Sequence, residues 1–187
     1  MTEQVVVLGS GYAGAGAVRS LEDELDGDAD IIWISDTDYH LVLHESHRCI
    51  SNPDVRDKIT IPVEDIKSPR TQFVQGSVEE IDVESRTVHL EDGSEQAFDY
   101  LLVGIGSQTA FFGIDGLKEH AHTLKGLDDA LGIHDELMEA AREATSTDPA
   151  QIVIGGAGLS GIQSAGEVAK FRDEYDAPLE VYLVEGL

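Results

Sequence analysis

Apolar runs alternate with glycine-rich turns and amphipathic stretches along the chain. The segments 4–8 (QVVVL) and 31–35 (IIWIS) are almost wholly apolar, which is typical of strands buried on both faces of a parallel sheet. Between them, residues 13–24 predict a helix rich in small side chains, and DGDAD at 26–30 predicts its end. This succession of strand, turn, helix and strand is the building unit of an α/β fold.

The pattern changes in the middle of the chain. Segments 71–83, 86–91 and 96–106 resemble strands, and a tight turn at Asp92-Gly93 separates the last two. We therefore expect an antiparallel meander that returns to a buried strand.

The last part of the chain repeats the first unit. Residues 127–145 predict an amphipathic helix, and QIVIGGAGLSG at 151–161 then starts a second buried strand, glycine turn and helix. A strand at 179–185 completes the repeat. The sequence therefore predicts the same supersecondary unit twice, at 4–36 and 151–185.

Composition supports a folded acidic protein. The 187 residues are 41% apolar, which argues against intrinsic disorder, and carry a formal net charge of −25. Without a cluster of Lys or Arg, nucleic-acid binding is excluded. Acidic residues spread along a chain with only 5 Lys favour a halophilic protein, whose self-repulsion is screened by salt; an acidic mesophilic protein is the alternative.

The first glycine turn has the pattern of a dinucleotide-binding loop. Glycines at its first, third and sixth positions permit a tight turn, close approach of a pyrophosphate and close helix–strand packing, and the helix N-terminus offers N–H groups to phosphates. The loop consists of Gly9, Ser10, Gly11, Tyr12, Ala13 and Gly14. Ser35 and Asp36 compete for the place of the ribose-binding acid, and we favour Asp36, because only a carboxylate can accept from both hydroxyls. The alternative is an ordinary glycine-rich turn.

The second loop has the same pattern, again between a buried strand and a helix. It consists of Gly156, Ala157, Gly158, Leu159, Ser160 and Gly161, and Glu185 stands at the end of the following strand. A glutamate there favours NADH over NADPH, because it would repel a 2′-phosphate. Two dinucleotide sites in one chain imply hydride transfer between a nicotinamide and a flavin.

Together these motifs resemble the type II NADH dehydrogenases of the FAD-dependent pyridine nucleotide-disulfide oxidoreductase superfamily. The resemblance rests on GSGYAGAGAV at 9–18, DYH at 38–40, the segment 98–131 and VIGGAGLSGIQSAGE at 153–167. It implies that the first loop binds FAD and the second NADH. The implied organisation is a Rossmann-like FAD-binding domain with a meander at 1–112, a connecting segment at 113–148, and the start of an NADH-binding domain at 149–187.

The resemblance also marks further positions and departures. Gly104, Ile105 and Gly106 stand where the family has Ala-Thr-Gly near the flavin, so a threonine hydroxyl is lost. Gln163 replaces a glutamate that relatives often carry near the nicotinamide, and Glu167 matches the acid of the family's AGE segment. Val78 in the meander is also a candidate cofactor-binding position. No side chain is expected to act as an acid–base catalyst.

Two other candidates have plainer interpretations. Cys49 is the single cysteine, which excludes an internal disulfide, and we interpret it as partly buried and structural; the alternative is a redox cysteine near the flavin. His40, His44, Glu45 and His47 invite a metal site, but a fourth ligand is not obvious. We favour the interpretation that these four residues lie in a loop beside the flavin or quinone pocket.

The resemblance implies electron transfer from NADH through FAD to a quinone. The alternatives are a sulfide:quinone oxidoreductase, a ferredoxin-type reductase, or a catalytically incomplete nucleotide-binding fragment. Family members continue for about as long again, so we expect an incomplete sheet that either assembles with another chain, as in a homo-oligomer, or has low stability, and a chain that can be inactive alone. With no signal peptide and no apolar run of about 18 residues, the sequence predicts a cytoplasmic chain, with peripheral membrane contact only through the second half of the longer relatives.

Overall fold

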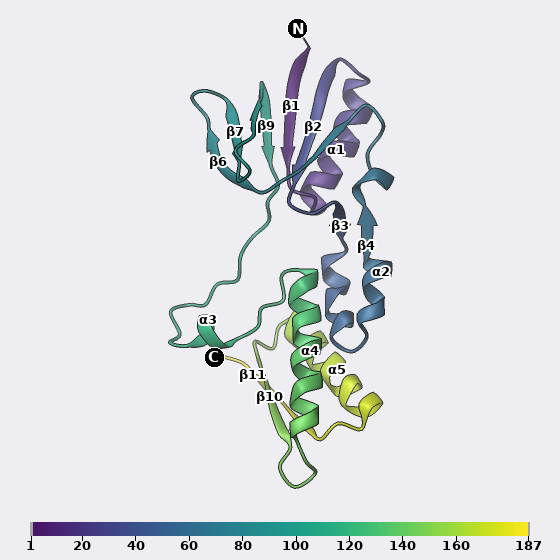
Figure 1. Cartoon of the computed structure of the whole chain (residues 1–187), viewed down its shortest axis with the longest axis vertical. Coiled ribbons are helices and arrows are strands. Elements are labelled where there is room, and N and C mark those ends of the chain that lie inside the picture. Colours follow the sequence, from purple (N-terminus) through teal and green to yellow (C-terminus); the bar gives the residue numbers. More distant parts are fainter. Residues whose placement is uncertain (1, 187) are drawn as a thin grey trace. The chain divides into compact units, whose positions relative to one another are not determined.

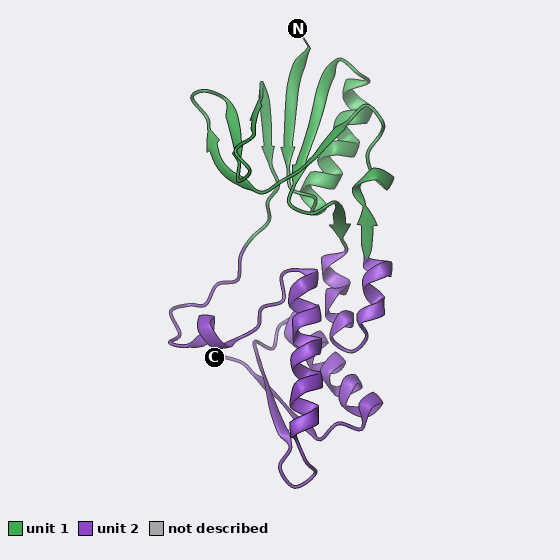
Figure 2. Ribbon diagram, viewed as in Figure 1, with its two compact units in different colours: residues 1–41, 60–107 green, residues 42–59, 108–187 purple. Residues whose placement is uncertain are grey.

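The computed structural model describes residues 2–186, which form two compact units (Figure 2). Unit 1 comprises residues 1–41 and 60–107, and unit 2 comprises residues 42–59 and 108–187. The segment 42–59 thus groups with the C-terminal residues, whereas the sequence placed it within a domain at 1–112.

Unit 1 is built on a parallel sheet with the strand order β5-β2-β1-β9 (Figure 1). Helix α1 connects its two central strands. The elements are β1 (Glu3–Leu8), α1 (Tyr12–Leu25), β2 (Ala29–Ser35), β5 (Gln72–Gln75) and β9 (Tyr100–Val103). The mixed α/β fold with a parallel sheet that the sequence predicted is confirmed.

Two small antiparallel sheets complete unit 1. The meander contains β6 (Val78–Asp82), β7 (Thr87–Leu90) and β8 (Glu95–Ala97). A second pair joins β3 (Tyr39–Leu41) to β4 (Thr60–Pro62), and the short helix η3 (Val63–Asp65) follows it.

Residues 5–8 of β1 and 31–34 of β2 are all apolar because both faces of the sheet are covered there. On one face, Val6 and Leu8 of β1 pack with Val88 and Leu90 of the meander. On the other face, Val7 packs with Val18 of α1 and with Trp33 of β2, in a cluster that also contains Val63. The continuous apolar run of β1 is the sequence signature of this two-sided burial.

The prediction of a single antiparallel strand at 71–83 was wrong. Residues 72–75 form β5, which runs parallel to β2, and only 78–82 belong to the meander. Gly76 separates the two: its N–H donates to the Ser35 carbonyl at 2.8 Å, at the end of β2. Segment 96–106 is likewise divided between β8 and β9, because the Asp99 N–H turns to the Gln4 carbonyl at 2.9 Å.

Unit 2 packs helices against a two-stranded parallel sheet, β10 (Ala150–Gly155) and β11 (Leu179–Val184). Its long helices are α4 (Leu127–Glu143) and α5 (Leu159–Tyr175). The shorter ones are η1 (Leu43–Ile50), η2 (Pro53–Val55), α2 (Arg56–Ile59) and α3 (Leu117–His120). The core joins Ile50, Leu137, Phe171 and Leu179.

The second sheet is covered on one face only, so the strand at 151–155, which the sequence predicted to be buried, is half-buried on one face and exposed on the other. Ile152 and Ile154 pack into the core, whereas Val153 is 66% exposed. On β11, Tyr182 and Val184 share the exposed face with Val153, because Tyr182 pairs with Val153 and successive side chains alternate. Helices α4 and α5 both contact β10, and their packing on one face explains the alternation.

Candidate functional site

The first glycine loop allows three backbone segments to come very close together. Gly9 has a φ of +94°, and a Cβ on it would lie 2.5 Å from the carbonyl oxygen of Gly104. A Cβ on Gly14 would lie 1.8 Å from the carbonyl oxygen of Gly9. Strand β1, helix α1 and the end of β9 therefore meet at positions that a larger residue cannot occupy.

The N-terminus of α1 has the properties of an anion site. Gly11 is the N-cap, no side chain caps the helix, and no acidic residue lies in its first turn. The space where a Cβ of Gly11 would be is open, since no atom lies within 4 Å. The first N–H groups of α1, which have no partner within the helix itself, and the positive end of the helix dipole lie at this open cradle, which fits a dinucleotide diphosphate.

Four other candidates of unit 1 lie outside this loop, on β6 and after β9. The Gly104 N–H donates to the Leu8 carbonyl at 2.8 Å, which fixes Gly104 beside the loop. Ile105 is 67% exposed, and Gly106 has a φ of +73°. Val78 lies at the start of β6, where it pairs with Leu90 and packs on the core of the meander.

Strand register decides which residue of unit 1 corresponds to the acid of unit 2. Leu8 pairs with Ile34 before the first loop, and Gly155 pairs with Val184 before the second. The next residues are Ser35 and Glu185, so Ser35 occupies the position equivalent to Glu185, and Asp36 lies one residue further along.

Ser35 faces inward and Asp36 outward. The buried Ser35 hydroxyl donates to the Ser10 hydroxyl at 3.0 Å and lies 3.3 Å from the Asp36 carboxylate. The hydroxyls of Ser10 and Thr37 are 2.9 Å apart. A hydroxyl network therefore stands where an acid stands in unit 2, with the exposed Asp36 carboxylate at its edge.

The second loop repeats the backbone geometry of the first. Gly156 has a φ of +97°, and a Cβ on Gly161 would lie 1.8 Å from the Gly156 carbonyl oxygen. Gly158 is the N-cap of α5, with no side-chain cap and no acid in the first turn. Leu159 is 75% exposed, and Ser160 beside it is also exposed. The Glu185 carboxylate accepts from the Ala157 N–H, which places the acid on the loop itself.

Two further candidates lie on α5. Gln163 is half-buried in the first turns of the helix. Glu167 accepts a hydrogen bond from the hydroxyl of Ser51 and forms an ion pair with Lys170 at 3.5 Å. The Glu167 carboxylate therefore joins α5 to the residue that follows η1, a contact that the sequence did not indicate.

Cys49 is fully buried on η1, more deeply than the sequence suggested. Burial raises the pKa of its thiol, with Glu167 acting in the same direction and Arg48 and Arg56 opposing it. A buried thiol that holds its proton is a poor nucleophile.

The four residues of the possible metal cluster are divided between two elements. His40 lies in β3 of unit 1, whereas His44, Glu45 and His47 lie on η1 of unit 2. Across residues 2–186, no group of three or more His, Cys, Asp or Glu is placed to hold a metal ion.

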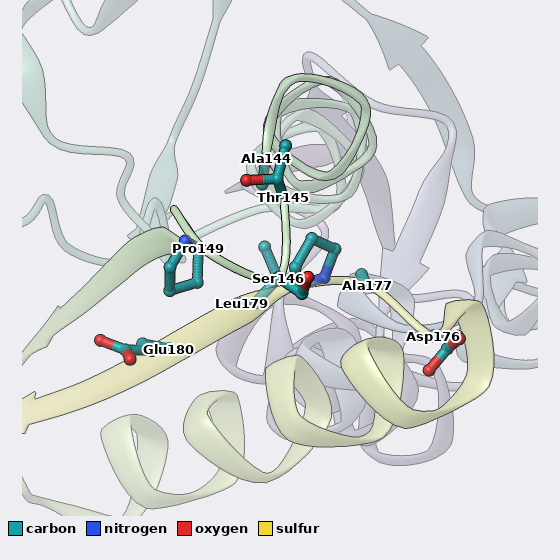
Figure 3. A pocket seen from close by; sticks show the side chains of 9 residues that line it. Ala144, Thr145, Ser146, Pro149, Asp176, Ala177, Leu179 and Glu180 are labelled. Carbon is teal, nitrogen blue, oxygen red and sulfur yellow. The ribbon is translucent and has the colours of Figure 1, made fainter.

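A cavity of about 540 Å³ lies in unit 2 at the end of the sheet opposite the second glycine loop (Figure 3). Pro149 and Leu179 line it where β10 and β11 begin, whereas the glycine loop follows the carboxyl end of β10. Asp176 and Glu180 add carboxylates to its wall. Nucleotides bind at the carboxyl ends of parallel strands, so this acidic cavity is not the dinucleotide site.

Three further residues hold the first loop, and the sequence had singled out only His40 among them. Trp33 Nε1 donates to the Gly9 carbonyl at 2.9 Å, and His40 Nδ1 lies 2.8 Å from the Ser10 carbonyl. The sequence did not indicate Trp33 or Thr37, whose hydroxyl lies 2.9 Å from that of Ser10. The tryptophan within an otherwise aliphatic strand was the one available signal, because a buried indole N–H needs an acceptor.

Two strand–glycine loop–helix units place the chain in the class of α/β proteins with dinucleotide-binding folds. The family model of pyridine nucleotide-disulphide oxidoreductases matches residues 3–187, and the chain belongs to this family.

Curated relatives match most of the chain. The type II NADH:quinone oxidoreductase of Staphylococcus haemolyticus is 31% identical over 176 residues, which are 90% of this chain and 43% of that protein. The protein of the same name from Staphylococcus aureus (strain NCTC 8325 / PS 47) is 30% identical over 173 residues, which are 89% of this chain and 43% of that protein. The chain therefore spans less than half the length of these relatives.

Solved structures share the fold. NDH2 from Plasmodium falciparum, solved in complex with NADH, matches with a TM-score of 0.83 and 18% identity over 100% of this chain and 42% of that one. The sulfide:quinone oxidoreductase of Aquifex aeolicus matches with a TM-score of 0.76 and 22% identity over 98% of this chain and 43% of that one.

Proposed function

We propose that this chain is the dinucleotide-binding part of an FAD-dependent NADH:quinone oxidoreductase, with FAD on the first glycine loop and NADH on the second. The observation that carries the proposal is the repeated cradle: Gly11 and Gly158 each begin a helix without a side-chain cap and without an acid in its first turn. The curated relatives of about 30% identity are named type II NADH:quinone oxidoreductases.

The residues of unit 1 fit FAD. The Gly11 cradle would receive the diphosphate, and the Asp36 carboxylate, next to the Ser35 hydroxyl, would accept from ribose hydroxyls. Gly104–Gly106 would lie toward the flavin, because Gly104 is fixed against Gly9. When bound, the flavin supplies the redox chemistry by accepting a hydride and releasing electrons to an acceptor.

The residues of unit 2 fit NADH. The Gly158 cradle would receive the diphosphate, and Glu185 would accept from the adenosine ribose. A 2′-phosphate would meet the Glu185 carboxylate at close range, which favours NADH over NADPH. Gln163 would offer an uncharged amide near the nicotinamide.

A sulfide:quinone oxidoreductase is the second candidate, because such an enzyme shares the fold. Sulfur chemistry would need a reactive cysteine, and Cys49 is buried with a raised thiol pKa. This favours NADH as the electron donor.

A quinone acceptor dissolves in the membrane, so we place the working protein at the inner membrane surface as a peripheral protein. No helix within residues 2–186 is long and apolar enough to cross a membrane.

Assembly is a separate part of the proposal. Val153 and Val184 are 66% and 53% exposed on the uncovered face of the second sheet, and Tyr182 lies between them at 43%. We infer that a second copy of the chain covers this face in a homo-oligomer. Size-exclusion chromatography with light scattering should show a dimer or larger species, and a well-folded monomer would contradict the inference.

The visible spectrum of the purified chain tests the main proposal. A yellow protein whose flavin band bleaches when NADH is added supports an FAD- and NADH-binding oxidoreductase. A folded chain that stays colourless after incubation with FAD supports a catalytically incomplete fragment.

A further inference from the structure

Two consecutive carbonyl groups of the first glycine loop are held by buried aromatic N–H donors. The Gly9 carbonyl accepts from Trp33 Nε1 at 2.9 Å, and the Ser10 carbonyl oxygen lies 2.8 Å from His40 Nδ1. The indole nitrogen can only donate. A carbonyl oxygen can only accept, so Nδ1 of His40 carries a proton.

Both donors are fixed in place. Trp33 is fully buried in the core of unit 1, and His40 is 7% exposed. The His40 ring makes an edge contact with the Tyr12 ring at 4.7 Å between centroids. Because the two donors come from β2 and β3, the loop is held from outside the turn itself.

Holding these carbonyls sets the direction of the next two N–H groups. In a trans peptide the C=O and N–H bonds point in opposite directions, and no peptide bond of the described chain is cis. The Gly9 carbonyl therefore determines where the Ser10 N–H points, and the Ser10 carbonyl determines where the Gly11 N–H points. These N–H groups lead into α1, where a diphosphate would be bound.

The second loop shows that a glycine turn of this shape does not need such a donor. A Cβ on Gly14 would lie 3.5 Å from Trp33 Nε1, and a Cβ on Gly161 would lie 3.5 Å from Leu183 Cδ1. Leu183 thus takes the place of Trp33 and has no hydrogen to donate. The Trp33 donor is therefore an addition to the first loop rather than a requirement of the turn.

We propose that Trp33 and His40 are positioning residues for FAD binding: by holding the carbonyls of Gly9 and Ser10, they keep the Ser10 and Gly11 N–H groups directed at the diphosphate. This inference rests on the proposed assignment of FAD to the first loop. It predicts that loss of either donor weakens FAD binding while NADH binding at the second loop is unchanged.

His40 offers a sharp test because asparagine can replace the Nδ1 donor with its amide nitrogen. Titration calorimetry of the full chain with FAD should show the dissociation constant rising about tenfold or more in His40→Leu, the range expected for a lost buried hydrogen bond. His40→Asn should stay within about threefold of the wild type. A folded His40→Leu that binds FAD like the wild type, or a His40→Asn as weak as His40→Leu, would overturn the proposal.

Trp33→Phe provides an independent variant, since it keeps an aromatic ring and removes the Nε1 donor. It should also weaken FAD binding, and unchanged affinity would overturn the role of Trp33 even if His40→Leu does not fold. His134→Leu is the matched control: His134 Nδ1 lies 3.0 Å from the Ile50 carbonyl in the core of unit 2. This variant should lose stability without losing FAD affinity, and an equal loss of affinity would make general destabilisation the cause and overturn the proposal.

The wild-type chain separates this inference from the proposed function. If it binds no FAD, the proposed function fails, and the same variants are then titrated with inorganic pyrophosphate, which probes the loop N–H groups alone. Weakened pyrophosphate binding in His40→Leu and Trp33→Phe would uphold the positioning role. A wild type that binds neither FAD nor pyrophosphate would overturn it.

Discussion

The α-carbon of Gly14 faces the carbonyl oxygen of Gly9 so closely that a Cβ would lie 1.8 Å from that oxygen. Gly161 has the same relationship to Gly156, also at 1.8 Å. In each unit the last glycine of the loop lets the helix start directly against the turn. The short contact is what brings the helix N-terminus to the end of the strand.

Gly14→Ala should therefore destabilise unit 1 strongly, whereas Gly16→Ala should not. No atom lies within 4 Å of a Cβ on Gly16, which is exposed on the same helix. We expect Gly14→Ala to cost about 1–3 kcal/mol or more through overpacking, and Gly16→Ala to stabilise by about 0.5–1 kcal/mol. Urea unfolding followed by the fluorescence of Trp33, the single tryptophan, measures both. A Gly14→Ala chain as stable as the wild type would show that this contact is not tight.

Glu185→Ser should weaken the discrimination between the two nicotinamide dinucleotides. The change places a serine at position 185, as unit 1 has at the equivalent position 35. It also removes the carboxylate that would repel a 2′-phosphate. We expect the ratio of NADPH to NADH dissociation constants to fall about tenfold. Glu180→Ser, at the far end of the strand that Glu185 follows, is the control and should leave the ratio unchanged. If Glu185→Ser keeps the wild-type ratio, Glu185 does not select the cofactor.

Glu22 should make unit 1 sensitive to acid. Its carboxylate accepts hydrogen bonds from the Ser68 N–H at 2.8 Å and from the Thr71 hydroxyl. Burial raises the pKa of this carboxyl. The hydrogen bonds from Thr71 and Ser68 together lower it by more than burial raises it, so the pKa lies below its ordinary value of 4.5. A pKa lowered on folding contributes stability above the unfolded value and loses it as the pH falls through the folded value.

The acid dependence is measured as the urea midpoint at pH values from neutral to well below 4.5, the ordinary pKa of this carboxyl. Glu22→Gln should lower stability near neutral pH and reduce the loss in acid. Glu24→Gln, an exposed neighbour on α1, should follow the wild-type curve. A Glu22→Gln curve parallel to that of the wild type would mean that Glu22 does not couple folding to pH.

Salt should stabilise the chain. A formal net charge of −25 with only 12 Lys and Arg means that folding brings many carboxylates together, and salt screens their repulsion. The thermal unfolding midpoint should rise steadily with KCl concentration. Midpoints that fall with added KCl would contradict adaptation to a salt-rich environment.

The sequence predicted the main elements of both units because their patterns are local. The buried run of β1, the small-residue helix α1 and the amphipathic helix α4 lie within a few residues of their predicted ranges. The glycine loops were predicted together with the helices that they begin, since glycine at fixed spacing has a specific backbone cause. The division of 71–83 at Gly76 was missed, because alternation does not distinguish a parallel edge strand from an antiparallel one.

What escaped prediction depends on contacts between distant residues. The position equivalent to Glu185 is Ser35, which follows from strand register and could not be decided between two neighbouring residues of the sequence. The contacts of Trp33 with Gly9, and of Ser51 with Glu167, join residues that no spacing rule connects. The contacts of His40 and Trp33 with the loop carbonyls depend on how β2 and β3 fold around the turn, which no local pattern of the sequence specifies.

We propose that the first loop binds FAD and the second binds NADH, so that the nicotinamide would give a hydride to the flavin. The most direct measurement is the visible absorption of the FAD-loaded chain as NADH is added without oxygen. The flavin band should be lost in proportion to the NADH added. Gly158→Glu places a carboxylate at the second cradle, and it should prevent the loss of the flavin band while FAD stays bound. A chain that binds FAD but keeps its flavin band with excess NADH would contradict the account.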